Sequence, residues 1–280
     1  MASNRPPAVA GAFYPSSPEA LEAQVRGFLG TGREKEPAFG AIVPHAGYVY
    51  SGDVAGQVYS RIDLGRRLVV LCPNHTGLGA FAAVDPRTTW ETPLGRVAVD
   101  RDLARRFLDR CPSLREDAVA HDREHSLEVQ LPFLQICRPE ASIVAISLGA
   151  PSLSLCREIG EAFADLAAEL DPSGGSMQLL ASSDMNHYES REVGNRKNAL
   201  ALARIEALDP QGLFDTVVSE DISMCGFLPV TALLYGAARR GGLSAEIVAL
   251  SDSGAQTRDP SSVVGYAGVV IRGGRNARVG

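Results

Sequence analysis

The sequence predicts an α/β protein made of a single domain, with a largely parallel central sheet flanked by helices. Short uninterrupted runs of valine, isoleucine and leucine alternate with segments of helical periodicity, which is the pattern of parallel strands covered on both faces. The 280 residues are 45% hydrophobic and 21% charged, an ordinary globular composition. Connections between elements are short, and no linker or internal repeat stands out. One domain is therefore expected over residues 1–280, with a frayed tail at 273–280.

The first half of the chain carries clear start and stop signals. Ser17 is a preferred N-cap residue, Pro18 suits the first helical position and Gly30 suits a helix end, so a helix is expected through residue 28. Apolar runs that end in a proline indicate buried strands at 38–43 and 67–72. The other elements expected here are a helix at 51–62, a pair of short strands at 80–84 and 95–99 flanking residues 90–94, a helix at 102–110, and a helix at 123–137 that Pro132 kinks.

The second half continues the alternation of strands and helices. Its glycine-rich and proline-containing stretches separate apolar runs whose lengths suit one type of element each. The expected elements are a strand at 142–147, a helix at 153–170, a loop at 171–176, a strand at 177–181, two helices within 193–218, a helix at 227–240 that Gly241 and Gly242 end, and strands at 245–251 and 264–271 that close the sheet.

Composition argues against several classes of partner. The formal net charge of −6 provides no basic face for a nucleic acid. No apolar run approaches the roughly 20 residues that a membrane-spanning helix needs. The first residues lack the basic and then apolar pattern of a secretory signal. Five cysteines without CxxC spacing favour a reducing compartment over a disulfide framework. A cytoplasmic protein without nucleic-acid or membrane partners is therefore expected.

Histidines follow three of the predicted strands at the point where each strand ends. These are His45, His75 and His187, three of only five histidines in the chain. Ligands of open α/β sheets bind beyond the carboxyl ends of the strands, so these side chains are expected to converge. Converging imidazoles indicate metal ligation or proton transfer, although a single loop histidine usually does neither. Asp184 precedes His187 by three residues and is expected to orient its ring for acid–base chemistry.

Three further positions carry weaker signals. His125 and Glu128 share a helical face if residues 123–137 are helical. They could then act as metal ligands, support the site or form an exposed charge pair, and the exposed pair is favoured. His121 is expected at the surface. Cys225 precedes the helix at 227–240, whose N-terminus would lower the pKa of its thiol. The other cysteines, Cys72, Cys111, Cys137 and Cys156, lie in predicted strands or at helical positions and are expected to be inert.

A series of motifs resembles the Memo family. They run in order along nearly the whole chain: RPPAVAGAFYP at 5–15, PHAGY at 44–48, PNHTG at 73–77, WETPLG at 90–95, EHSLEVQLP at 124–132, SDMNHY at 183–188 and CG at 225–226. Bacterial and archaeal members are known as protein B of the AmmeMemoRadiSam system, which implies an AMMECR1-like protein and a radical-SAM protein as partners. The family resembles the class III extradiol ring-cleaving dioxygenases in fold.

The resemblance implies roles for particular side chains. His45, His75 and Cys225 are expected to bind a metal ion, with His187 as the acid–base residue and Asp184 beside it. The dioxygenases use a carboxylate where this chain has Cys225, and the softer thiolate shifts the expected metal to iron or copper, with zinc as an alternative. The residues expected to support these ligands or to line a substrate pocket are Tyr48, Asn74, His125 and Glu128.

Three functions remain open from the sequence. The first is a metal-dependent redox or oxygen-handling enzyme that acts on an unknown small molecule. The second is a binding or signalling module that recognises a peptide or a small anion in an inherited pocket, because one fold hosts many functions. The third is a hydrolase that uses zinc with an open fourth coordination position. The most informative measurement is elemental analysis and spectroscopy of protein purified without oxygen.

Overall fold

The computed structural model describes residues 4–273, which assemble around one twelve-stranded mixed sheet. Four strands form its centre, in the order β10-β5-β11-β3. All neighbours within this group are parallel, and nearly every residue in them is buried. The predicted α/β class with a parallel sheet is therefore confirmed. The bounds of the four strands are Gly40–Val43 for β3, Arg67–Pro73 for β5, Ser142–Leu148 for β10 and Met177–Ser182 for β11.

Antiparallel strands extend one side of this centre. Strand β14 (Val263–Gly273) pairs antiparallel with β3. Both β13 (Leu243–Asp252) and β12 (His187–Glu189) pair with β14. The predicted tail at 273–280 therefore begins one residue too early, because Gly273 pairs with Leu243 in the ladder. The other residues of that tail lie outside the described part of the chain.

Short strands extend the opposite side, and here the predicted pairing is wrong. Strands 80–84 and 95–99 were expected to pair with each other, but β6 (Ala82–Val84) pairs with β10, and β8 (Gly95–Val99) pairs with β7 (Thr89–Thr92). The segment between them is itself a strand because its side chains alternate between the core and the surface, with Trp90 fully buried. The other short strands are β1 (Asn4–Arg5), β9 (Arg115–Glu116), β2 (Glu36–Pro37) and β4 (Ile62–Asp63), the last two in a separate sheet.

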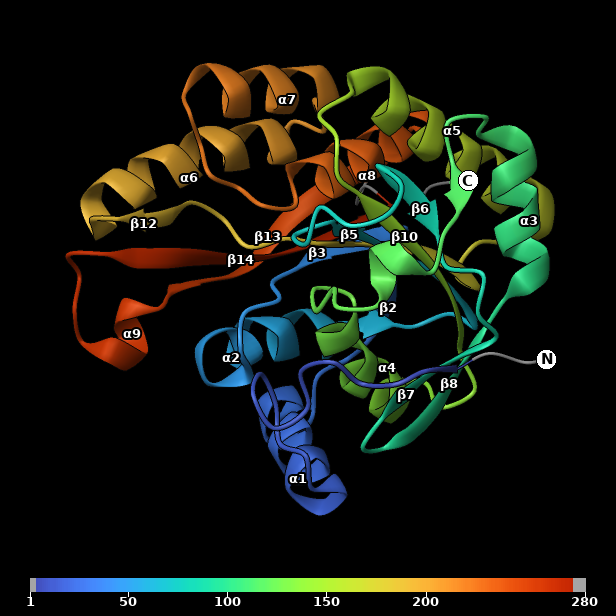
Figure 1. Cartoon of the computed structure of the whole chain (residues 1–280). Coiled ribbons are helices and arrows are strands. Elements are labelled where there is room, and N and C mark those ends of the chain that lie inside the picture. The colour runs from blue at the N-terminus through green and yellow to red at the C-terminus, as the bar shows by residue number, and fades with distance from the viewer. Residues whose placement is uncertain (1–3, 274–280) are drawn as a thin grey trace.

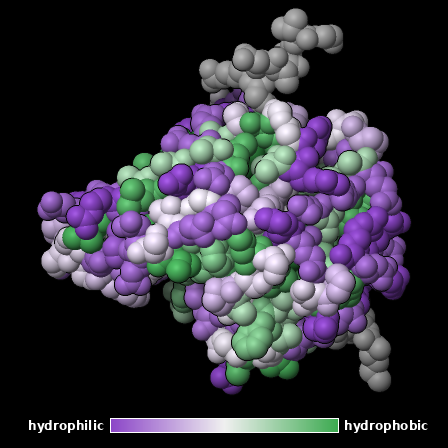
Figure 2. Space-filling model, turned by 90° about the horizontal axis from the view of Figure 1, so that it is seen from above, coloured by the Kyte–Doolittle hydropathy of each residue, from purple (hydrophilic) through white to green (hydrophobic). Residues whose placement is uncertain are grey.

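Helices cover both faces of the sheet (Figure 1). One face carries α3 (Arg101–Arg110), α5 (Leu153–Leu170), α6 (Arg191–Glu206), α7 (Pro210–Ser219) and α8 (Phe227–Arg240). The opposite face carries α1 (Pro18–Leu29), α2 (Tyr48–Tyr59) and α4 (Leu131–Cys137), and α9 (Gly254–Thr257) lies at the end of the β13–β14 hairpin. Figure 2 shows the outer surface of the first group, where hydrophilic residues predominate. Among residues 4–273, no helix has both the length and the hydropathy to cross a membrane.

The helix signals read from the sequence are correct for α1 and wrong for residues 123–137. Ser17 caps α1 by accepting a hydrogen bond from Ala20, and Gly30 ends it in the left-handed region. Residues 123–137 form a 3₁₀ turn at Glu128–Gln130 followed by α4. Pro132 lies in the first turn of α4, where its missing N–H costs no hydrogen bond, so it begins a helix and does not kink one.

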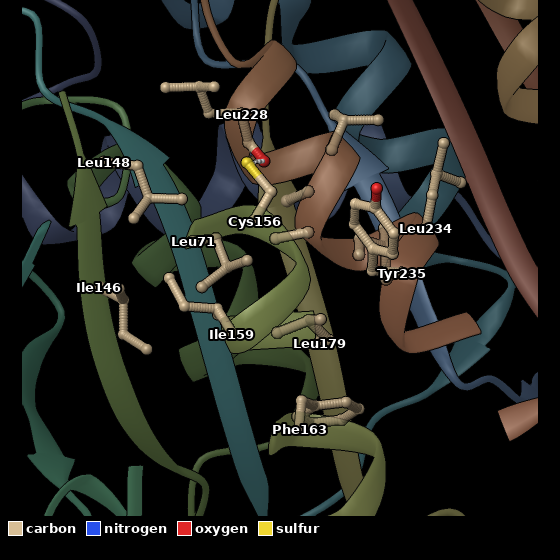
Figure 3. Close-up of a cluster of buried hydrophobic side chains, with 14 of the residues drawn as sticks. Leu71, Ile146, Leu148, Cys156, Ile159, Phe163, Leu179, Leu228, Leu234 and Tyr235 are labelled. Carbon is tan, nitrogen blue, oxygen red and sulfur yellow. Dashed lines mark hydrogen bonds between the residues drawn. The ribbon is translucent and has the colours of Figure 1, made fainter. Parts of the chain in front are cut away.

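Helices α5 and α8 pack against the sheet and against each other (Figure 3). Leu71, Leu148 and Leu179 of the strands belong to one hydrophobic cluster with Ile159 and Phe163 of α5, and all are almost completely buried. A fully buried side chain of this size stabilises the fold by about 1.5–3 kcal/mol relative to an exposed one. This packed layer holds the first turn of α8 against the sheet, which matters because Cys225 lies immediately before that helix.

The crossing of α5 and α8 depends on a glycine. A Cβ atom at Gly160 would overlap the backbone oxygen of Ala232. Gly160→Ala is therefore expected to lower the free energy of unfolding by about 1–3 kcal/mol despite the better helix propensity of alanine. Gly27 of α1 is the matched control, since no atom lies within 4 Å of a Cβ there and alanine should stabilise. Urea unfolding of both variants checks this; equal stabilities would contradict it.

Candidate metal centre

The order of the central strands brings three site loops together. Strand β11 lies between β5 and β3, with Ser182 opposite Val43 in the register. Because parallel strands end at the same edge, the loops that carry His45, His75 and His187 leave the sheet side by side. The histidines that the sequence placed at strand ends therefore lie within one region of the structure.

Cys225 reaches the same edge from the start of α8. The backbone N–H of Gly226 donates to the Ser183 hydroxyl at 3.1 Å, and the N–H of Asp184 donates to the Cys225 sulfur at 3.3 Å. A Cβ atom at Gly226 would overlap the carbonyl oxygen of Ser182, so only glycine permits this close approach to the end of β11. Gly226 in the CG motif at 225–226 is thus required by packing.

Three potential ligand atoms converge at this point. One ligand atom each from His45, His75 and Cys225 lies within 4.8 Å of the others. The Cys225 sulfur is 3.1 Å from Nε2 of His45, and the rings of His45 and His75 are 5.2 Å apart between centroids. The three side chains come from positions 30 to 180 residues apart in the chain, yet they occupy one small volume.

The protonation state of His45 follows from its neighbours. The Ser182 hydroxyl donates its only proton to the Ser126 carbonyl at 2.7 Å, so it accepts from Nδ1–H of His45 at 2.9 Å. Nε2 of His45 therefore carries the lone pair and faces Cys225. Burial holds the pKa of His45 well below its usual value, and the nearby imidazoles of His75 and His125 add to this. A neutral imidazole with an available nitrogen is the form that binds metals.

His75 is oriented by a carboxylate that the sequence analysis missed. Glu124 is fully buried and accepts from Nδ1 of His75 at 2.9 Å and from its backbone N–H at 2.6 Å. Burial tends to raise the pKa of Glu124, but the hydrogen bond and electrostatic attraction of His75, together with the backbone and side-chain hydrogen bonds of Ser126, lower it to about 2. This carboxylate–histidine arrangement orients the ring and leaves Nε2 of His75 free. The only sequence signal was the adjacency of Glu124 to His125 in the 124–132 motif.

Loss of the Glu124 charge is expected to weaken metal binding. Glu124→Gln should lower the affinity for a divalent metal about 10–100-fold, because groups that orient a ligating histidine have effects of this size. The exposed Glu220→Gln serves as the control. Competition against a chromophoric chelator measures both variants. An affinity for Glu124→Gln within twofold of the parent protein would remove Glu124 from this role.

His187 and Asp184 lie beside these side chains, but among residues 4–273 no hydrogen bond from Asp184 orients the ring of His187, as had been expected. Nδ1–H of His187 donates to the Ser223 carbonyl at 2.8 Å, so Ser223 orients the ring. Asp184 instead accepts from the backbone N–H of His45 at 2.7 Å. One ligand atom each from Asp184, His187 and Cys225 lies within 4.8 Å of the others. Burial lowers the pKa of His187 and raises the pKa of Asp184 to about 7.

The pKa of the Cys225 thiol shifts in the direction opposite to the prediction. The start of α8 was expected to lower its pKa, but burial, followed by the negative charge of Asp184, raises the pKa of Cys225 well above its usual value. Hydrogen bonds from the backbone of Asp184 and Gly226 oppose this effect without overcoming it. The reason is that desolvation of a thiolate outweighs a helix-terminus contribution of about 0.3–1 kcal/mol.

His125 and Glu128 do not form the exposed pair that was favoured. The ring of His125 stacks on His75 at 4.8 Å and contacts Phe13 at 4.6 Å, so it belongs to the wall of the site. Glu128 is fully buried and forms an ion pair with Arg5. It also accepts from the hydroxyl of Tyr14. Glu128 therefore anchors the N-terminal segment and does not line the pocket.

The other two predicted supporting residues, Tyr48 and Asn74, do not line the cavity. Tyr48, the first residue of α2, is buried in the core, where its hydroxyl donates to the Val129 carbonyl at 2.6 Å. Asn74 donates to the Leu78 carbonyl at 2.8 Å and thereby shapes the loop after His75. His121, expected at the surface, is fully buried with Nε2 3.1 Å from the Ala83 carbonyl. Its prediction was wrong because β6 covers it.

A cavity of about 680 Å³ opens onto the convergent ligands. Its wall combines the predicted site residues with others that the sequence analysis did not assign to the site, although Phe13 and Tyr188 lie within the motifs at 5–15 and 183–188. These additions come from separate parts of the chain, so only the folded chain brings them together: Phe13, Tyr50, Tyr188, Ser253, Thr257, Val264 and Tyr266. A volume of this size accommodates a small organic molecule.

Fold and site together define an α/β protein with a candidate mononuclear metal pocket at the carboxyl edge of its sheet. The family model described as Memo-like protein matches residues 5–270. The chain belongs to this Memo-like family.

Curated relatives agree over almost the full length. The chain is 38% identical to a MEMO1 family protein of Methanopyrus kandleri, covering 96% of this chain and 99% of the relative. It is 39% identical to a MEMO1 family protein of Methanosarcina acetivorans, with 95% and 98% covered. Among solved structures, an uncharacterized protein from Escherichia coli K12 is similar with a TM-score of 0.47 and 16% identity, over 72% of this chain and 85% of that chain.

Proposed function

We propose that this protein is a metal-dependent redox or oxygen-handling enzyme, in which His45, His75 and Cys225 bind one iron or copper ion. The observation that carries the proposal is the convergence of these three ligand atoms within 4.8 Å beside an open cavity. Hydrogen bonds at Nδ1 direct Nε2 of both histidines toward the site, so little reorganisation is needed to bind an ion.

The donor set fits such an ion. Two imidazoles and one thiolate suit iron, copper or zinc and do not suit magnesium or calcium, which prefer oxygen ligands. Three protein ligands leave coordination positions toward the cavity. A bound iron or copper ion would supply Lewis acidity and one-electron chemistry at that point.

The remaining side chains of the site can move protons. His187 keeps Nδ1–H on the Ser223 carbonyl, so its Nε2 is free to accept a proton from a substrate hydroxyl. Asp184, with a pKa of about 7, exchanges a proton near neutral pH. The histidine and the carboxyl group each have one ligand atom within 4.8 Å of the other, and the buried setting strengthens their electrostatic effect on a bound molecule.

Anaerobic metal loading tests the proposal. Protein purified without oxygen and incubated with Fe(II) or Cu(I) should retain about one ion per chain after gel filtration, and the loaded protein should consume oxygen faster than free metal. His187→Gln should keep the ion and slow oxygen consumption. Retention of neither iron nor copper would overturn the proposal, and stoichiometric zinc with ester or amide hydrolysis would replace it with a hydrolase.

Metal affinity is expected to depend on pH with a defined sign. Because the pKa of Cys225 lies well above its usual value, the thiol keeps its proton at neutral pH in the metal-free protein. Binding must release this proton, so the affinity for zinc should rise about tenfold per pH unit between roughly pH 7 and 8.5. The lowered pKa of His45 adds no slope there. Chelator competition at several pH values checks this; the Cys225→Ala variant should show a much smaller slope.

A further inference from the structure

The cavity wall beyond the metal ligands is aromatic and lacks positive side chains. None of the described residues that line it is a lysine or an arginine. Its one carboxyl group, Asp184, already accepts from the backbone of His45. Around it stand four aromatic rings, those of Phe13, Tyr50, Tyr188 and Tyr266. Such a wall offers planar apolar faces and hydroxyl groups to a ligand, and offers no lysine or arginine to pair with an anionic group that lies away from the metal.

Tyr188 occupies an unusual backbone position at the mouth of this cavity. The register of the β12–β14 ladder breaks between His187 and Glu189, so Tyr188 is displaced from the strand. Its φ of 59° lies in the left-handed region, which is costly for an aromatic residue. Bulges next to sites commonly re-aim one side chain. Here the bulge directs the ring of Tyr188 to the cavity, although 78% of the residue remains exposed.

The structure holds this strained residue from both sides. The backbone N–H of His187 donates to the Ser223 hydroxyl at 2.7 Å. On the other side, Glu189 pairs with Lys197 at 3.0 Å. The ring itself contributes little to the fold, because its one aromatic contact within residues 4–273 is with His187, at 5.7 Å between centroids. A strained, anchored and exposed aromatic residue beside a site suits contact with a ligand better than a role in stability.

We propose that the cavity takes an uncharged, ring-bearing molecule, and that Tyr188 contacts its ring at the mouth. Whether the bound molecule reacts depends on the proposed function. The kind of molecule that binds is inferred from the cavity wall alone. A phosphorylated or sulfated ring would lose its hydration without gaining an arginine or lysine partner. An uncharged ring would instead cover the ring of Tyr188, and both rings would lose water contacts and gain contacts with each other.

Ligand-observed NMR titrations of the full-length, metal-free protein test this inference. Three matched probes separate ring from charge: N-acetyltyrosinamide, its O-phosphorylated form and N-acetylleucinamide. The neutral tyrosine probe should bind about tenfold or more tightly than the phosphorylated probe, because an unpaired buried charge costs several kcal/mol. It should also bind more tightly than the leucine probe.

Variants locate the contact. Tyr188→Ala should weaken binding of the tyrosine probe about threefold to tenfold, which is the range of one aromatic contact, and Tyr188→Phe should retain it. Phe81→Ala is the control, since Phe81 is 70% exposed and does not line the cavity. Tighter binding of the phosphorylated or leucine probe, no binding of the tyrosine probe, or an unchanged Tyr188→Ala variant would overturn the inference.

The outcome is separable from that of the proposed function. Metal retention by Tyr188→Ala should equal that of the parent protein, because Tyr188 is not one of the ligands. Protein that binds iron or copper but prefers the phosphorylated probe contradicts only the inference. Protein that retains no metal but prefers the neutral ring contradicts only the proposed function.

Discussion

Cys225→Ala is expected to reduce the affinity for a transition metal about 100-fold or more while leaving the fold intact. Four-ligand zinc sites gain on the order of 10–16 kcal/mol, or roughly 3 kcal/mol for each ligand, and about 1.4 kcal/mol corresponds to a tenfold change. Cys225 also supplies the only anionic ligand of the proposed three, since His45 and His75 bind as neutral imidazoles. The loss should therefore exceed that of any residue that only orients a ligand.

Cobalt(II) under anaerobic conditions provides a direct measurement. The parent protein should show a thiolate-to-cobalt charge-transfer band in the near ultraviolet that Cys225→Ala lacks. Cys137→Ala is the matched control, because Cys137 ends α4 and lies outside the site. Thermal unfolding of both variants should stay close to that of the parent. A cobalt spectrum that is unchanged in Cys225→Ala would exclude the thiol from the metal site.

The second large effect concerns the ion pair between Arg5 and Glu128. Both side chains are fully buried, and Arg5 also stacks on Trp90 at 4.4 Å. Glu128 accepts from the backbone N–H groups of Ala8 and Val9 as well. Removing one partner leaves a buried charge without compensation, so Glu128→Ala is expected to lower the free energy of unfolding by about 3–5 kcal/mol.

A double replacement separates charge from packing. Arg5→Met combined with Glu128→Leu removes both charges and keeps apolar volume, so it should be several kcal/mol more stable than Glu128→Ala. Denaturant unfolding at pH 7 gives the three values. If Glu128→Ala loses less than about 1 kcal/mol, the pair has little structural effect and the N-terminal segment is held by other contacts.

Elements with strong local signals were predicted closely. The bounds of α5 and α8 agree with the expected 153–170 and 227–240, because apolar periodicity and end signals such as Gly241 act within a few residues. The prediction of one helix at 123–137 was wrong because helical spacing does not reveal the distant partners of the two carboxylates. Glu124 hydrogen-bonds His75, and Glu128 forms an ion pair with Arg5. Partners more than 40 residues away leave no periodic signal.

The amino-acid sequence by itself determined that histidines follow the strands now labelled β3, β5 and β11, because strand ends and prolines are local features. Tertiary structure alone decided that β11 lies between β5 and β3, which brings His45 and His75 to Cys225. It also decided that burial raises the pKa of the Cys225 thiol and that Glu124, not Glu128, orients the ring of His75. Burial and hydrogen bonding are properties of neighbours in space, and sequence order does not specify those neighbours.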